Sequence, residues 1–240
     1  SIFESMYKYG LKRVIDFILV FIVLVVIWPI LLLITIWLHF ANKGAGAFFT
    51  QERPGKDGRI FRLIKFKSMT DERDAEGKFL PDAKRLTHVG KFVRATSIDE
   101  LPQLINVLKG DMALIGFRSP LTYHPWPWSE YTEEQKKMFN VRPGITGWAQ
   151  VNGRKTVEWN KRIELNGWYA EHVSFWLDVK ILFMTVFKVG PEIIHSELTG
   201  EVVLGLLPSL LAIFLVSGFL LPLVVDFGLM DLLGTLISKS

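Results

Sequence analysis

The sequence predicts a mainly helical α+β domain with a small strand element, embedded in one face of a membrane. Phe17–Leu38 is a run of 22 residues without a charge, and Val202–Val225 is another of 24. Each run is long enough to cross about 30 Å of hydrocarbon as a helix, which excludes a freely soluble protein. Between them lies a polar stretch with both helix and strand patterns. We therefore expect an N-terminal membrane helix (residues 1–41), a polar domain (residues 42–200) and an apolar tail of unknown role (residues 201–240).

The overall charge and the absence of cysteine narrow the possible partners. The 240 residues include 28 basic and 24 acidic side chains, for a net charge of +4. This balance suits an anionic membrane surface or phosphate-bearing ligands. It is too mild for a nucleic-acid-binding protein, and no nucleic-acid motif is present, so we expect no nucleic acid partner. Without cysteine, disulfides, Cys-ligated zinc and thiol catalysis are excluded.

The first apolar run predicts a retained anchor rather than a signal peptide. A signal peptide has a shorter apolar core, usually about 7–15 residues, and a small-residue cleavage site, whereas this run continues through Trp37 and Leu38. Basic residues flank both of its ends, and a spanning helix can place only one flank on the cytoplasmic side. Pro29, near the middle, removes a backbone hydrogen bond. We therefore favour a re-entrant helix broken at Pro29; the alternative is a Pro-kinked spanning helix.

The polar middle predicts short elements separated by turns. Residues 60–67 are typical of a strand, and four segments are typical of helices: residues 101–108, 133–139, 157–169 and 175–189. Residues 71–84 are charged and indicate a surface excursion. The last helix is apolar on most faces, and tryptophans cluster at residues 125–128. Such segments either build the core or lie at a membrane interface. Beside the anchor, we favour amphipathic helices partly sunk in the interface.

The adjacent carboxylates Asp99 and Glu100 stand at the start of a predicted helix and have two interpretations. In the structural one, Ser97 or Asp99 is the N-cap and Glu100 favours the helix dipole. The Asp99 cap is the better of the two because it puts Pro102 in the first turn. In the functional one, the helix N-terminus keeps Asp99 ionised and attracts phosphate, and the carboxylate attacks phosphorus. Glu100 then helps to hold Mg²⁺, which takes few carboxylates and relies on phosphate oxygens.

Basic side chains recur beside glycines and turns and could hold a diphosphate. Arg binds phosphate bidentately and Lys binds it as a point charge. The candidates are Lys65, Arg94, Arg118, Arg142 and Arg154. For each of them the alternative is a solvated basic surface.

Longer motifs, in a fixed order, carry a family resemblance. They are Lys12-Arg13-Val14-Ile15-Asp16, Phe49-Thr50-Gln51-x-Arg53-Pro54-Gly55, Lys65-Phe66-Lys67-Ser68-Met69, Arg94-x-x-Ser97-Ile98-Asp99-Glu100-Leu101-Pro102-Gln103, Asn106-Val107-Leu108-Lys109-Gly110-Asp111-Met112 and Arg142-Pro143-Gly144-Ile145-Thr146-Gly147. From about Tyr7 to Val189 the chain resembles the bacterial monotopic phosphoglycosyl transferases, the polyprenyl-phosphate sugar-1-phosphate transferase family.

The resemblance implies an enzyme that moves a sugar 1-phosphate from a UDP-sugar to undecaprenyl phosphate and releases UMP, and we expect an N-acetylated sugar. It implies a re-entrant anchor in the bacterial inner membrane, with the catalytic domain on the cytoplasmic face and downstream glycosyltransferases as possible partners. Carried over by position, Asp99 is the nucleophile, and Glu100 completes the dyad and with it places Mg²⁺. Arg118 falls in the phosphate loop, with Lys65 and Arg94 nearby.

Two departures from the family pattern keep other functions open. The phosphate loop reads Gly116-Phe117-Arg118-Ser119 instead of Gly-Pro-Arg-Pro, so the backbone at Arg118 is less rigidly preset. The apolar tail is unusual for a small member. The alternatives are an inactive relative that scaffolds a glycan-assembly complex, a metal-dependent hydrolase of nucleotide diphosphates, and, from the tail alone, a permease fragment. Direct attack by the lipid phosphate, without a covalent enzyme, is also open.

Overall fold

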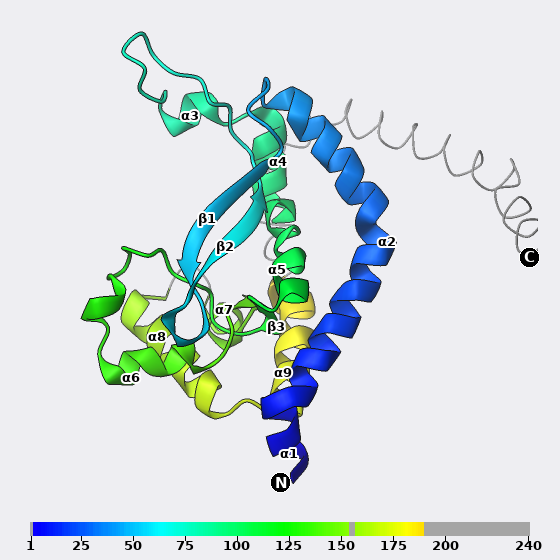
Figure 1. Ribbon diagram of the computed structural model, residues 1–240, viewed down its shortest axis with the longest axis vertical. Coiled ribbons are helices and arrows are strands. Elements are labelled where there is room, and N and C mark those ends of the chain that lie inside the picture. Colours follow the sequence, from blue (N-terminus) through cyan, green and yellow to red (C-terminus); the bar gives the residue numbers. More distant parts are fainter. Residues whose placement is uncertain (1, 154–156, 190–240) are drawn as a thin grey trace, which may run out of the picture. The chain divides into compact units, whose positions relative to one another are not determined.

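The computed structural model describes residues 2–153 and 157–189 (Figure 1). The described part is mainly helical with two small sheets, which confirms the expected helical character and small strand element. Arg154 and the tail at residues 201–240 lie outside the described residues.

The elements have these bounds. The α-helices are α1 (Ile2–Met6), α2 (Lys12–Ala41), α3 (Asp82–Arg85), α4 (His88–Ala95), α5 (Gln103–Lys109), α6 (Glu133–Lys136), α7 (Trp148–Val151), α8 (Trp159–Glu171) and α9 (Phe175–Met184). The strands are β1 (Phe48–Pro54), β2 (Ile60–Phe66), β3 (Ala113–Ile115) and β4 (Gly144–Thr146). Short 3₁₀ helices cover Lys56–Gly58, Ile98–Glu100, Trp128–Glu130 and Lys137–Asn140, and π-helical turns cover Tyr7–Leu11 and Thr185–Val189.

The predicted break at Pro29 is wrong, because α2 continues through this residue as one helix. Figure 1 shows α2 as a bowed rod along one side of the domain. Pro29 lacks the amide of one hydrogen bond, but its fixed φ is compatible with a helix. Packing holds both sides of it, through Leu24 and Ile27 before and Leu31 and Ile34 after. Among the described residues, Ile2–Ala41 is the one helix long and apolar enough to cross a membrane by length and composition.

Successive stretches of this N-terminal helix pack on different core clusters of the domain. Tyr7, in the π-helical turn, packs with Tyr169 and Ile181. Val20 joins a cluster that includes β2 and α5 side chains, and Leu38 joins one that includes Phe66 of β2 and Val93 of α4. Burying an aliphatic side chain contributes about 1.5–3 kcal/mol. The inner face of the helix is therefore held against the domain along its whole length.

Polar contacts tie both ends of α2 to the same domain. At the N-terminal end, Arg13 donates to the carbonyl oxygens of Val107 (2.6 Å) and Leu108 (2.7 Å), which belong to the last turn of α5. At the C-terminal end, the buried Asn42 donates through Nδ2 to the carbonyl oxygen of Lys67 at 2.7 Å. Both ends of the apolar helix are thus attached by hydrogen bonds to the same folded domain.

The two sheets are small and bring distant segments together. β1 and β2 form an antiparallel hairpin, in register from Phe48 opposite Phe66 to Pro54 opposite Ile60. In Figure 1, α4 and α5 lie between this hairpin and α2. β3 and β4 pair in parallel, and the backbones meet so closely after β3 that a Cβ on Gly116 would overlap the carbonyl oxygen of Arg142. This close pairing fixes the start of the loop that carries Arg118.

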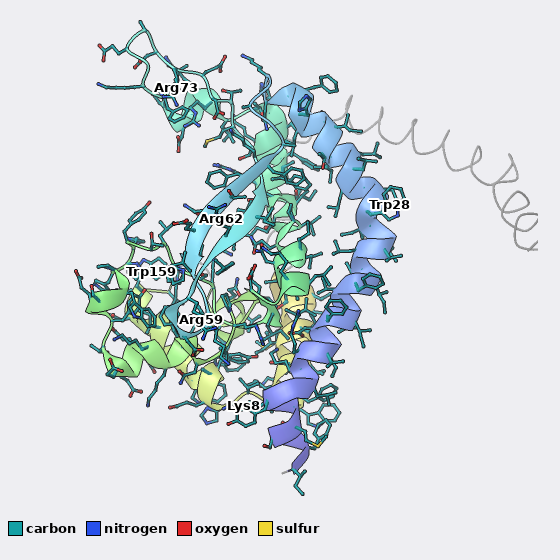
Figure 2. All side chains as sticks on the ribbon, in the orientation of Figure 1. Lys8, Trp28, Arg59, Arg62, Arg73 and Trp159 are labelled. Atoms are coloured by element: carbon teal, nitrogen blue, oxygen red, sulfur yellow. The ribbon has the colours of Figure 1, made fainter. Side chains whose placement is uncertain are left out.

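The predicted helices exist, and α9 presents two different faces. Its inner face buries Asp178 and Ile181, whereas Trp176 and Phe183 on the outer face are 71% and 62% exposed. α2 is also apolar on its outer side, where Figure 2 shows Trp28 pointing away from the domain. The tryptophan cluster is different, because Trp126 and Trp128 pack on Tyr131 and belong to a turn against the core.

Candidate active site

Asp99 and Glu100 lie in a 3₁₀ turn between α4 and α5, and neither caps a helix. The N-cap of α5 is Pro102, without a side-chain cap hydrogen bond. Ser97 precedes the turn in the left-handed region, with φ at 58°, and makes no cap bond either. The N-cap interpretation is therefore wrong for both Ser97 and Asp99. The α-helix starts a turn later than a cap at Asp99 requires, which leaves both carboxylates available for other partners.

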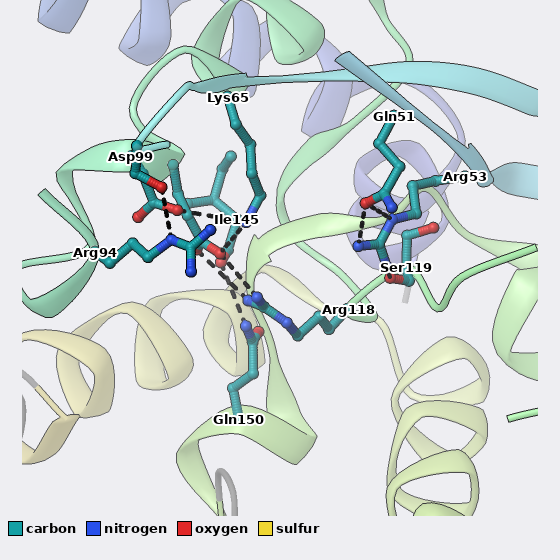
Figure 3. Close-up of polar contacts among 11 residues, drawn as sticks. Gln51, Arg53, Lys65, Arg94, Asp99, Arg118, Ser119, Ile145 and Gln150 are labelled. Carbon is teal, nitrogen blue, oxygen red and sulfur yellow. Dashed lines mark hydrogen bonds and ion pairs between the residues drawn. The ribbon is translucent and has the colours of Figure 1, made fainter. Parts of the chain in front are cut away.

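Two cations from other parts of the chain converge on this carboxylate pair (Figure 3). The ammonium group of Lys65 lies 3.1 Å from Oε1 of Glu100 and 3.7 Å from Oδ2 of Asp99. The guanidinium group of Arg118 lies 2.8 Å from the same Glu100 oxygen. Glu100 is thus hydrogen-bonded from two sides, whereas Asp99 faces Lys65 across a longer gap.

Local packing positions the side chain of Arg94. Its Nε donates to Oγ of Ser68 at 2.7 Å, which directs the guanidinium toward the turn from α4. The approach of α4 to Ser68 depends on Gly90, since a Cβ there would overlap the Ser68 carbonyl oxygen. Arg94 lies close enough for its charge to lower the pKa of Asp99. Lys65, Arg94 and Arg118 therefore meet around one dyad, as the family resemblance implies.

The two carboxyl groups have opposite pKa shifts. Burial raises the pKa of Asp99 above its ordinary value, and the charge of Glu100 adds to this, against the charges of Lys65 and Arg94. Burial also acts to raise the pKa of Glu100, but the charges and hydrogen bonds of Arg118 and Lys65 prevail and lower it to about 2. The pair thus contains one carboxylate held by cations and one that is desolvated.

A cavity of about 740 Å³ contains this group. Asp99, Glu100, Lys65, Arg94 and Arg118 all line its wall. On another side, Leu182 and Thr185, from α9 and the turn that follows it, line it as well. The cavity is large enough for a nucleotide-sized ligand, and it borders the helix whose outer face is apolar and exposed.

Arg142 and Arg154 do not join the group that the structure describes. Nε of Arg142 donates to the carbonyl oxygen of Gly110 at 2.8 Å, and Arg142 does not line the cavity. Gly110 is the C-cap residue of α5, and the carbonyls at a helix end need donors, so Arg142 completes a helix end instead of a phosphate site. Arg154 lies outside the described residues.

Arg53 lines the cavity, although the sequence indicated only a basic flank and a turn there. It stands near the end of β1, opposite Phe61. Burial lowers the pKa of Arg53, and the charge of Arg118 lowers it further. Arg53 belongs to one of the motifs that carry the family resemblance. The role of Arg53 depends on a contact with the loop after β3, which local sequence patterns cannot predict.

The acidic groups suit a metal ion that is shared with a substrate. Among residues 2–153 and 157–189, no group of three or more His, Cys, Asp or Glu side chains is placed to hold a metal. Asp99 and Glu100 offer hard carboxylate oxygens from adjacent positions. Mg²⁺ is often held by one or two carboxylates together with substrate phosphate oxygens. The residues therefore fit Mg²⁺ bridged to a diphosphate, but not a cage made of protein alone.

Comparison with known proteins places the chain in a family. The bacterial sugar transferase family model matches residues 7–191. An uncharacterized sugar transferase of Bacillus subtilis, EpsL, is 52% identical over 160 residues, which cover 67% of this chain and 78% of that protein. The UDP-glucose:undecaprenyl-phosphate glucose-1-phosphate transferase of Escherichia coli is 38% identical over 185 residues, or 74% of this chain and 40% of that protein.

A third relative gives the same result. The undecaprenyl-phosphate galactose phosphotransferase of Salmonella typhimurium is 34% identical over 192 residues, or 73% of this chain and 39% of that protein. The chain thus spans most of the Bacillus relative but well under half of the two named transferases. The match to the family model, over residues 7–191, covers α2, the dyad and α9, and confirms the resemblance read from the motifs. The chain belongs to the bacterial sugar transferase family.

Proposed function

We propose that this chain transfers a sugar 1-phosphate from a UDP-sugar to undecaprenyl phosphate and releases UMP. The observation that carries the proposal is the grouping of Asp99 and Glu100 with Lys65, Arg94 and Arg118 in one cavity beside α9. The names of the Escherichia coli and Salmonella relatives support this reaction class. Such a reaction needs positive charge around a diphosphate, a nucleophile, and access to both an aqueous and a lipid substrate.

The dyad suggests a division of roles. In the first step a carboxylate oxygen of Asp99 attacks the phosphorus that bears the sugar, and the bond from this phosphorus to the bridging oxygen breaks. UMP leaves with the electron pair, and the sugar phosphate is bound to Asp99 as an acyl phosphate. In the second step a phosphate oxygen of the lipid attacks the same phosphorus and frees the carboxylate. Neither step requires Asp99 to give up a proton.

The cations account for the electrostatics of these steps. A carboxylate approaching a diphosphate meets strong repulsion, which Lys65, Arg94 and Arg118 reduce by placing positive charge along the cavity wall. Glu100, with a pKa of about 2, stays ionised and fixes two of these cations. Mg²⁺, when bound through Asp99 and Glu100, would supply further charge neutralisation on the diphosphate.

The apolar outer surface supports a membrane location. Along α2, side chains such as Val26 (69% exposed) and Trp28 (59%) point outward, and α9 adds Trp176 and Phe183. Apolar surface of this extent marks an interaction site. We propose that it lies in the cytoplasmic leaflet of the bacterial inner membrane, with both ends of α2 on the cytoplasmic side, so that the cavity meets the phosphate of the lipid at the interface.

The alternative of an inactive scaffold is not favoured. Its support was the loss of both prolines around Arg118, yet the loop still brings Arg118 to Glu100. A hydrolase of nucleotide diphosphates would need no lipid substrate, and the apolar surface beside the cavity would then have no role in turnover.

The decisive experiment measures UMP release by the detergent-purified protein. A panel of UDP-sugars, N-acetylated and plain, is incubated with Mg²⁺, with and without undecaprenyl phosphate. We expect lipid-dependent release with one or two donors; lipid-independent release of sugar phosphate would instead indicate the hydrolase.

A variant of the nucleophile tests the covalent step. Asp99→Asn should lower turnover on the order of 10³-fold or more, as expected for a lost nucleophile, while Asp82→Asn, at the exposed start of α3, should retain it. With donor alone, mass spectrometry should find the phosphosugar on the peptide that contains Asp99. Turnover of Asp99→Asn within tenfold of wild type would favour direct attack by the lipid phosphate.

A further inference from the structure

Hydrogen bonds and packing fix the backbone on both sides of Arg118. Oγ of the buried Ser119 donates to the carbonyl oxygen of Pro54, at the end of β1, at 2.5 Å. The Ser119 carbonyl in turn accepts from Nη1 of Arg53 at 2.8 Å. On the other side, Phe117 is fully buried against the ring of Phe139, with ring centroids 4.9 Å apart.

Arg53 is itself held before it reaches the loop. Oε1 of Gln51 accepts from Nη2 of Arg53 at 2.7 Å and from its Nε at 3.1 Å. Figure 3 shows Gln51, Arg53 and Ser119 as a group separate from Asp99 and Arg94, with Arg118 extending toward Lys65. Two bonds from the end of β1 therefore fix Ser119, the residue next to Arg118.

We infer that Ser119 and Arg53 are positioning residues that hold Arg118 on Glu100; the inference rests on the proposed transferase function. The side chain of Arg118 is 57% exposed, so packing does little to select its conformation. Arginine has much rotamer freedom to lose. Fixing the backbone removes the part of this freedom that would move the whole side chain away from Glu100.

This arrangement replaces what proline provides in the Gly-Pro-Arg-Pro pattern. Proline presets φ through its ring, whereas here a buried phenylalanine and a serine hydroxyl fix the same two positions through contacts. Unlike a ring, the hydroxyl contact depends on a partner far away in the sequence, so a single substitution can remove it.

The first test needs no activity. Amide hydrogen exchange in the peptide covering residues 116–120 is compared between wild type, Ser119→Ala, Ser119→Thr and the control Ser129→Ala, an exposed serine in a 3₁₀ turn. We expect faster exchange in this peptide for Ser119→Ala alone, with Ser119→Thr close to wild type because it keeps the hydroxyl. Unchanged exchange in Ser119→Ala would overturn the inference, whether or not the protein transfers sugar phosphate.

The second test is a double-mutant cycle on UMP release. Ser119→Ala should lower turnover roughly tenfold, the scale of one buried hydrogen bond, with little change in the KM of the lipid. In an Arg118→Met background the same change should have no further effect, because Ser119 acts through Arg118. Equal losses in both backgrounds would contradict this role. Absence of UMP release by the wild type would instead count against the proposed function and leave the exchange result standing.

Discussion

At the scale of single residues, Asp99 and Glu100 are adjacent in the chain but differ in their environment. Glu100 is paired with Arg118 and Lys65, so its charge is stabilised and its pKa falls to about 2. Asp99 is desolvated without an equally close partner, which raises its pKa. A carboxylate with a higher pKa is more basic, and Asp99 is also held less closely by Lys65 than Glu100 is. Of the two, Asp99 is therefore better suited to attack phosphorus, and Glu100 to organise the cations.

This difference predicts the acid limb of the pH profile. kcat/KM depends on ionised Asp99, so activity falls as the pH drops through the pKa of Asp99 in the free enzyme. The positive charge of Arg94 lowers that pKa, so Arg94→Met should raise it and move the acid limb to higher pH. The profile of UMP release is measured at fixed Mg²⁺, with Lys91→Met, exposed on the same helix, as the control. If the acid limb of Arg94→Met stays in place or moves to lower pH, the assignment of this limb to Asp99 is contradicted.

The two lysines at the end of β2 form a matched pair for a second prediction. Lys65 contacts both carboxylates, whereas Lys67 donates to Asp71 and to the carbonyl oxygen of Ala45. Lys65→Met should lower kcat/KM roughly 10–100-fold because it removes charge beside the transferred phosphate. Lys67→Met should have a small effect. UMP release by the two purified variants provides the measurement, and equal losses would show that net charge, not position, matters.

At the scale of elements, patterns along the chain predicted the helices better than the turns that carry the chemistry. The sequence predicted α5, α8 and α9 to within a few residues of their observed bounds, and β2 was expected as a strand. β1 and α4 were missed. The pattern of β1 mixes polar and apolar residues, whereas α4 is amphipathic and capped by Thr87, whose hydroxyl accepts from the amide of Gly90, so its local signal was present but not read. Lys65, Arg94 and Arg118 were expected near Asp99 from the resemblance. The 3₁₀ turn itself was not expected, because the residues Ser97–Pro102 also fit the sequence pattern of an α-helix N-terminus.

The junction of the N-terminal helix with α9 gives a prediction at the same scale. The buried Asp178 accepts hydrogen bonds from Tyr7 (2.6 Å), Lys12 (2.5 Å) and Tyr169 (2.6 Å). Asp178→Ala would leave Lys12 with only its longer ion pair to Asp16 (3.7 Å) and would remove the shared acceptor of Tyr7 and Tyr169. We expect a cost of about 3–5 kcal/mol in the free energy of unfolding.

Denaturant unfolding in detergent measures this cost. The matched control is Glu164→Gln, which breaks a surface pair with Lys161 on α8 and should have little effect. Similar losses in the two variants would show that the junction contributes no more than an exposed ion pair.

At the scale of the whole described domain, the contacts at the two ends of α2 restrict how it can lie in a membrane. Thirty residues of helix measure about 45 Å, more than the hydrocarbon thickness. A spanning helix would separate its ends across the bilayer. Here Arg13 and Asn42, at opposite ends, hydrogen-bond to the same folded body, and core clusters hold the helix between them. The helix can therefore enter the membrane only by its outer face, together with the domain edge.

The absence of cysteine allows a direct test of this arrangement. Single cysteines replace Tyr9, before the apolar run, Trp28, on its outer face, and Lys56, in the turn between β1 and β2. With a membrane-impermeant maleimide on inside-out inner-membrane vesicles, Tyr9→Cys and Lys56→Cys should both react. Trp28→Cys should react only after detergent is added, because lipid covers it. Labelling of Tyr9→Cys only in right-side-out vesicles would establish a spanning helix, and would require the contacts of Lys12 and Arg13 to be broken in the membrane.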